Sequence, residues 1–491
     1  MKLRIKYFSL ILVVLFNFSC SNDWLELLPP GGLIKEEFWQ SKEDVEAVLM
    51  ASYESFAAMD RSLFLYGELR GDLLQRGSNQ SGTEQDIMEN NIYPENNFAD
   101  WSRFYEIINY CNEVIKNAPL VQEKDNTFTD FQKLSFLSEA YFLRSLAYFY
   151  LIRIYHEVPL ILEPSESDNV DFYIPKSPEE TILNQIVSDL KANRAFAPSG
   201  SFITVEENKG RASKTAYDAL LADIALWRFQ YEEVLEHIRN IESVEELVLM
   251  PAGKWFEIFY PGNSLEGIFE FQFDGNRNQN NGTYGLTHRT ALQYLPSQKA
   301  LEMFAHEFSF ELLRGEDASI AKIGENNYII WKYVGRAPDG QSFRSGSDQY
   351  SANWILYRYA DILLMKAEAL SQLGRFNEAL EIINEEIRNR ANVPSRSIAF
   401  TPVAFEDAIL EERALELAFE GKRWFDLLRM GRRNNFARKT QLIEIIVANA
   451  PSTQKRVLAA KLSNPMGWYL PIYSTEIERN INLVQNPYYE F

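Results

Sequence analysis

Apolar positions recur along most of this chain at intervals of three and four residues, which is the spacing of one face of an α-helix. Phe104, Ile107, Cys111 and Val114 show the pattern in one such segment. The segments predicted to be helices are residues 36–59, 101–117, 131–155, 178–195, 212–241, 355–373, 376–391, 403–419 and 422–430. The clearest strand is 267–273 (GIFEFQF). The pattern therefore predicts a mostly α-helical fold with few short strands.

Two of the predicted helical regions contain a weak internal repeat. Ala222 and Ala225 align with Ala367 and Leu370, and the second copy, AEALSQLGRFNEALEIIN, has a Gly-Arg turn between two helices. This pattern resembles a tetratricopeptide repeat, in which small residues allow close packing of paired helices. Because such pairs bury their apolar faces only by stacking, we expect about four helix pairs in a right-handed superhelix. The alternative is an accidental pair of helices joined by a tight turn.

The segment 411–429, EERALELAFEGKRWFDLLR, predicts two helices separated at Gly421. Leu415 and Phe419 would face a core before the glycine, and Trp424 would do so after it. Gly421 stands where a helix ends in the left-handed conformation, which glycine adopts without strain. The charges threaded through both helices are most simply a salt-bridged surface.

The start of the chain predicts a lipoprotein signal rather than part of the fold. A basic start is followed by an apolar run, residues 8–18, which is shorter than the ~20 residues that span a bilayer. Ser19 and Cys20 come next, and they predict removal of residues 1–19 and lipidation of the Cys20 sulfur. Asn17 stands where the usual signal has leucine, so an ordinary secretory signal and an uncleaved anchor are the alternatives.

Composition narrows the class of partner. The formal net charge of −20 argues against binding to nucleic acid and against docking on anionic membranes through basic patches. A local basic exception is expected to be a solvated helix end. Its members are Arg429, Arg432, Arg433, Arg438 and Lys439. Once Cys20 is lipidated, Cys111 is left without a disulfide partner and is expected to be a buried small hydrophobic residue.

Catalytic motifs are missing from the sequence. It contains no HExxH, GxSxG or Walker A motif, no GxGxxG after a strand, and no Cys/His spacing typical of a metal site. Glycan hydrolysis would need two paired carboxylates, but 69 acidic residues make candidate pairs uninformative. We therefore predict a binding protein rather than an enzyme, with no cofactor and no metal.

Long polar loops rich in Gly, Asn and Ser carry the candidate binding residues, since such loops in a compact protein are often functional. A sugar site needs aromatic faces against the CH faces of the ring and polar side chains for the hydroxyls. The predicted aromatic contacts are Trp101, Tyr284, Tyr294, Trp331 and Tyr350. The predicted polar contacts are Asp72, Arg76, Asn79, Asn281 and Arg289. For each aromatic the alternative is core packing, and Trp101 in particular heads a predicted helix.

Short motifs in a fixed order connect the chain with a known family. In chain order they are ELRGD (68–72), EAYFLR (139–144), VPL (158–160), GRASK (210–214), RYADILLM (358–365), AEAL (367–370), ERALELAFEGKRWFDL (412–427), LPI (470–472) and QNP (485–487). Together they resemble the signature of the SusD/RagB family of nutrient-binding outer-membrane lipoproteins. Gly71, Tyr473 and Tyr488 depart from the residues usual in that family.

The resemblance implies one SusD-like domain over residues 20–491. Its tetratricopeptide-like helices would lie mainly within 36–59, 101–155, 212–241 and 355–391, and its loop-rich binding part mainly within 71–100 and 251–354. Buried or half-buried charge networks are expected at scaffold arginines. These are Arg144, Arg211, Arg358 and Arg413.

The resemblance also implies a function at the cell surface. The protein would be lipid-anchored in the outer membrane, face the cell exterior, bind oligosaccharides and deliver them to a SusC-like TonB-dependent transporter. Three alternatives are the same role with oligopeptide cargo, an assembly factor for outer-membrane proteins, and a hydrolase.

Overall fold

The computed structural model describes residues 38–79, 82–165, 172–200, 202–288, 290–307, 313–323, 327–337 and 343–490. The predicted signal (1–19) and Cys20 lie outside these residues. The described helices are α3 (Lys42–Ala57), α4 (Asp60–Glu68), α5 (Gly82–Met88), α6 (Ser102–Lys124), α7 (Asp130–Tyr155), α8 (Glu179–Asn193), α9 (Val205–Gly210), α10 (Lys214–Trp227), α11 (Tyr231–Glu242), α12 (Tyr284–Thr287), α13 (Gln298–Glu307), α14 (Tyr359–Gln372), α15 (Phe376–Glu381), α16 (Pro402–Glu416), α17 (Arg423–Phe436), α18 (Lys439–Ala448), α19 (Lys455–Leu462) and α20 (Ser474–Arg479). The prediction of a mostly helical fold is confirmed.

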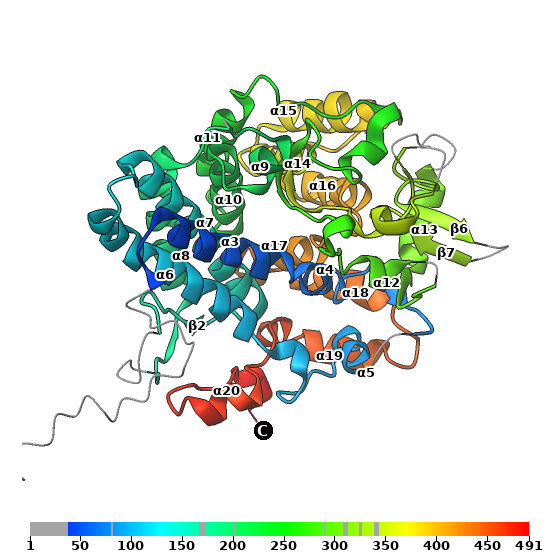
Figure 1. Cartoon of the computed structure of the whole chain (residues 1–491). Helices are drawn as coiled ribbons and strands as arrows, with labels where there is room; N and C mark the ends of the chain where they lie inside the picture. The colour runs from blue at the N-terminus through cyan, green and yellow to red at the C-terminus, as the bar shows by residue number, and fades with distance from the viewer. Residues whose placement is uncertain are drawn as a thin grey trace, which may run out of the picture.

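Helices that follow one another pack in pairs, α6 with α7, α10 with α11, and α14 with α15 and its π-helical continuation η8 (Ile382–Arg388). Further contacts of α3 with α6, of α7 with α8 and of α11 with α14 join the pairs into one stack, seen in the left and upper parts of Figure 1. Gly374 makes the turn between α14 and α15 at a φ of +76°, as the repeat pattern predicts. The fold therefore has a tetratricopeptide-like helical body.

The strands form small antiparallel pairs. They are β1 (Leu74–Arg76) with β5 (Tyr294–Pro296), β2 (Val158–Pro159) with β3 (Lys176–Ser177), β4 (Gly267–Phe271) with β8 (Trp354–Arg358), and β6 (Ile320–Ile323) with β7 (Asn327–Ile330). The predicted strand 267–273 is confirmed as β4. The prediction of a helix from residue 355 is wrong for its first turn, which is β8. Every residue of β8 is buried, and a fully buried strand has the same continuous apolar pattern as a buried helix.

The elbow at Gly421 contacts a segment far away in the sequence, the C-terminal end of α4. Its φ of +72° confirms the predicted left-handed conformation. Glu68 of α4 accepts hydrogen bonds from the backbone N–H of Gly421 at 2.9 Å and of Lys422 at 3.2 Å. A Cβ added at Gly67 would lie 1.8 Å from the Gly421 carbonyl oxygen, so glycine is required for this contact. Figure 1 shows α4 and α17 side by side in the middle of the molecule.

Most charges of the 411–429 segment form a buried network instead of the predicted surface, with the exposed Glu411 as an exception. Glu412, Glu416 and Arg358 are 0% exposed. Arg358 donates to Glu416 at 2.7 Å, to Glu266 at 2.6 Å and to both oxygens of Glu420 at 2.8 Å. The predicted networks at Arg144, Arg211, Arg358 and Arg413 are confirmed, since each is paired with a carboxylate.

The basic residues after position 428 are not a solvated helix end, and that expectation is wrong. Arg429 and Arg433 are 4% and 2% exposed, and both bind the carboxylate of Glu368 on α14. Arg432 pairs with Glu179 at 2.8 Å. A sequence shows the run of positive charge, but the carboxylates that neutralise it come from other helices. Cys111 is buried as predicted, and burial raises the pKa of its thiol to about 12.

Candidate functional site

Loops from distant parts of the chain meet beside the helical body and form a surface that we call the loop face, consisting of residues 274–288, 290–297 and 343–353. Two short 3₁₀ helices, η6 (Gly275–Arg277) and η7 (Gly346–Tyr350), pack against each other there. Ser347 donates its hydroxyl to the side-chain oxygen of Asn276 at 2.7 Å, and the Gly275 N–H donates to the Ser351 hydroxyl at 3.0 Å. These bonds hold the two loops in register without a sheet.

The start of α4 anchors the loop face to the helical body. The buried carboxylate of Asp60 accepts the Thr283 N–H at 3.0 Å and the Thr283 hydroxyl at 3.1 Å. Burial raises the pKa of Asp60, and the hydrogen bonds from Thr283 act in the opposite direction. Gly282 allows this approach, because a Cβ there would lie 2.9 Å from an Asp60 oxygen. The α12 turn that follows is therefore fixed at its base.

Aromatic rings gather at the outer side of the loop face. The Tyr284 ring stacks on the His288 imidazole at 4.3 Å and meets the Tyr350 ring edge-on at 4.7 Å. Tyr284 is buried, and its hydroxyl donates to Gln349 of the opposite loop. Tyr350 is 36% exposed, so it presents ring surface to solvent while Tyr284 supports it from below.

A second exposed ring, Phe343, belongs to the same loop. It is 65% exposed and packs edge-on against Trp331 at 5.4 Å. Trp331, which the sequence singled out, is only 6% exposed and forms the support for Phe343. The sequence prediction missed Phe343. Its position in a Gly- and Ser-rich stretch two residues before Ser345 was the available indication.

The structure separates the predicted site residues into three groups, and Tyr284 and Tyr350 are the predicted aromatics that it brings together. Asn281, 3% exposed, supports them by donating its side-chain N–H to the Ala352 carbonyl at 2.5 Å. Asn79 is exposed and donates to the Ala291 carbonyl at 2.9 Å, which ties the end of β1 to the loop face. Arg289 lies outside the described residues.

Two predicted contacts are buried scaffold residues, which corrects their assignment as ligand contacts. Asp72 is 1% exposed, and its two oxygens accept Arg423 donors at 2.6 and 2.9 Å. Tyr294 is 0% exposed and donates to Glu84 at 2.6 Å. Neither offers a face or a free oxygen to a ligand. Both sit in polar loop sequences, where burial is not visible from the sequence.

The last two predicted residues lie at cavities away from the aromatic rings. Arg76 lines a cavity of about 490 Å³ between β1, α5 and the α18–α19 region. Trp101 lines another, of about 350 Å³, beside α6 and α20. Its indole is 2% exposed, and its N–H lies 3.4 Å from a Glu476 oxygen, so most of the ring packs in the core.

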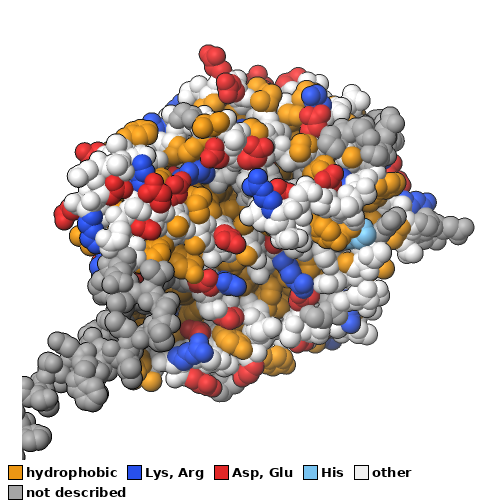
Figure 2. Space-filling model, viewed as in Figure 1, with side chains coloured by type: hydrophobic (Ala, Val, Ile, Leu, Met, Phe, Trp, Pro, Cys, Tyr) orange, Lys and Arg blue, Asp and Glu red, His pale blue; other side chains and the backbone are white. Residues whose placement is uncertain are grey.

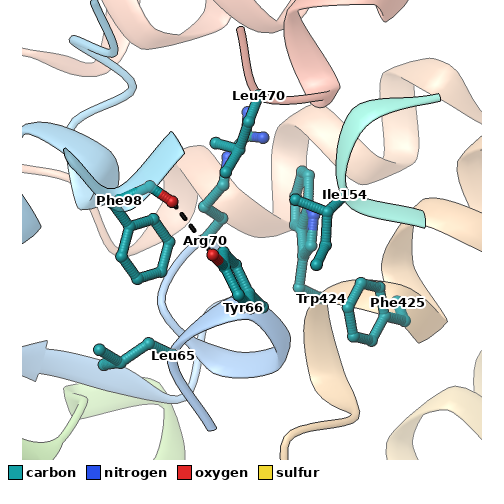
Figure 3. A pocket seen from close by; sticks show the side chains of 8 residues that line it. All are labelled: Leu65, Tyr66, Arg70, Phe98, Ile154, Trp424, Phe425 and Leu470. Carbon is teal, nitrogen blue, oxygen red and sulfur yellow. Dashed lines mark hydrogen bonds between the residues drawn. The ribbon is translucent and has the colours of Figure 1, made fainter. Parts of the chain in front are cut away.

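A third hollow lies inside the helical body and has no room for a ligand. It is a void of about 10 Å³ lined by Tyr66, Arg70, Trp424 and neighbours (Figure 3). That space holds one water molecule at most. The Arg70 guanidinium lies 4.5 Å from the centre of the Trp424 ring and donates to the carbonyl oxygens of Trp468 and Gly467 at 2.5 and 2.7 Å. Burial lowers its pKa to about 10.

Charge on the visible surface is mixed. Figure 2 shows acidic and basic side chains scattered over the viewed face, without a large region of one sign. Near the rings, Arg344 is buried with its guanidinium 4.6 Å from the centre of the Tyr260 ring, and burial lowers its pKa to about 10. The loop face thus combines exposed aromatic rings with neutral polar groups and with charged side chains of both signs, Asp274, Arg277 and Asp348, so that no single sign of charge dominates it. This arrangement suits an uncharged polyhydroxylated ligand.

Family models match both halves of the chain. The model described as "SusD family" matches residues 270–489, and the model described as "Starch-binding associating with outer membrane" matches residues 23–226. SusD-like protein P38 of Formosa agariphila is 27% identical over 470 residues, covering 86% of this chain and 90% of the relative.

Solved structures share the fold. A SusD superfamily protein of Bacteroides thetaiotaomicron aligns with a TM-score of 0.72 at 22% identity, covering 92% of this chain and 99% of that one. A laminarin binding SusD-like protein aligns with a TM-score of 0.70 at 20% identity, covering 91% and 99%. In the part of the chain that the structure describes, no helix has both the length and the apolar character needed to cross a membrane.

Proposed function

Since this chain belongs to the SusD family, we propose that it binds oligosaccharides on the loop face and delivers them to a SusC-like TonB-dependent transporter. The observation that carries the proposal is the pair of exposed rings, Tyr350 and Phe343, each supported from below by a buried aromatic. A supported ring is rigid, so little conformational entropy is lost when a sugar packs on it.

The polar groups around the rings fit hydroxyl recognition. Asp348, Ser345 and Asn79 are exposed at or beside the loop face and can donate to or accept from hydroxyls. Aromatic stacking combined with such contacts is the chemistry of a shallow glycan site. The likeness to a laminarin binding protein supports the glycan class.

The cellular role rests on the family and on the start of the chain. We place the protein at the outer membrane, anchored through lipid on Cys20, exposed to the exterior and paired with the transporter. The family description "Starch-binding associating with outer membrane" supports this placement. We assign binding and delivery, not catalysis. Peptide cargo is the alternative, and no described residue of the loop face favours it over a glycan.

The test is calorimetric titration of the purified mature protein with a panel of neutral oligosaccharides that includes laminarin fragments. We expect binding of at least one member, weakened by Tyr350→Ala and by Phe343→Ala. Phe131→Ala is the matched control, because Phe131 is 78% exposed on α7, outside the loop face. Absence of binding across the panel, or equal loss in the control, would overturn the glycan assignment.

A further inference from the structure

Of the two ligand-sized cavities described above, the one beside β1 is the larger, and it differs in chemistry from the loop face. It measures about 490 Å³ and is bounded by β1, α5 and the α18–α19 region. Its described lining residues include all of β1 but none of β5, the strand that pairs with β1. The cavity therefore lies along the edge of β1 that points away from β5.

No strand among the described residues pairs with the backbone groups on that edge. The Gly77 N–H donates to the Gln293 carbonyl at 2.9 Å, and the Ser297 N–H donates to the Leu73 carbonyl at 2.8 Å. Hydrogen-bonding direction alternates along an antiparallel strand, so residues 73, 75 and 77 face β5 and Leu74 and Arg76 face the other way. Opposite Leu74 stands Pro296, which has no N–H to donate, in agreement with this register. Within the described residues, β1 pairs with no second strand.

The cavity walls suit a polypeptide better than a sugar. The lining residues in the described structure include amide side chains and aliphatic groups, among them Gln75, Gln85, Gln454, Leu74 and Val457, and none is aromatic. Amides pair with peptide groups, and aliphatic walls accept alternate side chains of an extended strand. A sugar ring would find no aromatic face there.

Charge around the cavity is positive although the whole chain is acidic. Its lining contains Arg76 and Lys461 against a single carboxylate, Glu89. Glu89 is occupied by the side-chain N–H groups of Gln85 at 2.7 Å and Asn91 at 3.2 Å, and Lys461 donates to the Asn91 side chain. Arg76 is exposed and pairs with no carboxylate of the described structure, so it is available to an incoming one.

We propose that this cavity is a docking site for an extended, acidic segment of a partner protein, which adds to β1 as a third strand and places a carboxylate beside Arg76. The occupant is a segment of a protein rather than a free peptide, because β1 offers outward backbone groups at only two positions, Leu74 and Arg76. Each backbone hydrogen bond adds little net affinity in water, so a strand this short binds a free peptide weakly. A segment already tethered by a docked partner gains from effective concentration.

The site is separate from the proposed glycan site but adjoins it, since β5, which pairs with the other edge of β1, is part of the loop face. Docking of a partner segment on β1 and glycan binding on the loop face are therefore separate functions, placed on either side of the β1–β5 pair. Failure of either in experiment leaves the other standing.

The test uses blocked synthetic pentapeptides of alternating valine and glutamate at millimolar concentration, with hydrogen exchange of the full mature chain as the readout. We expect protection of β1 backbone amides and weak binding. The same peptide N-methylated at alternate residues keeps its side chains but loses strand pairing, and it should give no protection. The lysine counterpart should bind roughly fivefold more weakly, since a rim ion pair contributes up to about 1 kcal/mol.

Two sets of variants test whether the protection of the β1 amides arises from peptide bound at the edge of β1 that points away from β5. Arg76→Pro removes the outward N–H while sparing the bonds to β5, and it should abolish the protection. Val457 is 57% exposed on α19, so Val457→Asp and Val457→Lys should both fold, and they should weaken and strengthen binding of the acidic peptide respectively. Equal binding of the N-methylated peptide, or no opposition between the two Val457 variants, would overturn the proposal.

A final experiment distinguishes docking of a tethered partner segment from binding of a free peptide. The valine–glutamate peptide, fused by a flexible linker to the C-terminus of the chain, should protect β1 at micromolar protein concentration, where the free peptide does not. If the free peptide already saturates the site at micromolar concentration, the cavity is a peptide-ligand site and the assignment to a partner segment is wrong.

Discussion

Replacement of Arg358 by methionine should be one of the most destabilising single changes in the scaffold. Its guanidinium makes five hydrogen bonds, to Glu266 at 2.6 Å, to the side chain and carbonyl of Glu416 at 2.7 Å each, and to both oxygens of Glu420 at 2.8 Å. All five donors of an arginine are therefore used. The Arg358 side chain and its carboxylate partners are essentially inaccessible to water.

The expected loss of stability follows from the carboxylates that remain buried after the substitution. Glu420 retains Lys332 at 2.8 Å and Glu266 retains Arg390 at 3.2 Å, but both carboxylates lose their shared partner. Removal of one member of a buried ionic network costs about 3–5 kcal/mol, because charge is left uncompensated in a medium of low polarity. Equilibrium unfolding in guanidinium chloride measures the loss. Arg375→Met is the matched control, expected near 0.5 kcal/mol, since its pair with Glu378 is solvent-exposed.

The loss of stability caused by Arg358→Met should also become smaller as the pH falls. The arginines hold the pKa values of Glu416 and Glu420 below the usual range, against the effect of burial. Such groups add stability above the unfolded pKa, and that stability is lost as pH falls. The gap between wild type and Arg358→Met should therefore narrow below about pH 4.5. A loss under about 1 kcal/mol at neutral pH, or a gap that widens in acid, would refute the claim that ionised pairs lock the scaffold.

Other parts of the scaffold give further predictions. Burial raises the pKa of Glu68 from 4.5 to about 8, so the native carboxyl stays protonated while the unfolded one ionises, and stability falls as pH rises through this window. Glu68→Gln should remove this pH dependence of the free energy of unfolding, which amounts to up to roughly 5 kcal/mol at about 1.4 kcal/mol for each pKa unit. An unchanged slope between pH 4.5 and about 8 would contradict the raised pKa of Glu68. Gly421→Ala should lower the thermal unfolding temperature more than Gly374→Ala. Both glycines have a positive φ, but a Cβ at Gly421 would also lie 2.9 Å from the Trp354 ring, whereas a Cβ at Gly374 would meet no described atom within 4 Å. Cys111, with its pKa raised to about 12 by burial, should not react with a thiol reagent at neutral pH until the protein unfolds, and prompt labelling of the native protein would count against its burial.

The helices of the helical body could be predicted largely from the local spacing of apolar residues and turn glycines. Gly421 and Gly374 mark turns that only a positive φ satisfies, and both were recognisable from their place between apolar helical runs. The partners of these turns could not be predicted. Gly67 and Glu68 lie more than three hundred residues before Gly421, and no local rule connects them.

The candidate site was predictable at the level of loops but not of individual residues. Tyr350 and Trp331 occupy similar sequence surroundings, but Tyr350 is exposed at 36% and Trp331 lies beneath Phe343 at 6% exposure. Whether a loop aromatic faces solvent depends on which other loop covers it, and that is set by contacts distant in sequence. The same reason explains Asp72, whose partner Arg423 comes from the other end of the chain.

The central claim is that cargo binds on the loop face and not on the tetratricopeptide-like helices. The most direct test is a crystal structure of the mature protein with the oligosaccharide that binds best in calorimetry. We predict a sugar ring packed on Tyr350 or Phe343, with its hydroxyls hydrogen-bonded to neighbouring polar groups of the same loops. A sugar bound on the helical body or in one of the two cavities, with the loop face empty, would contradict the account.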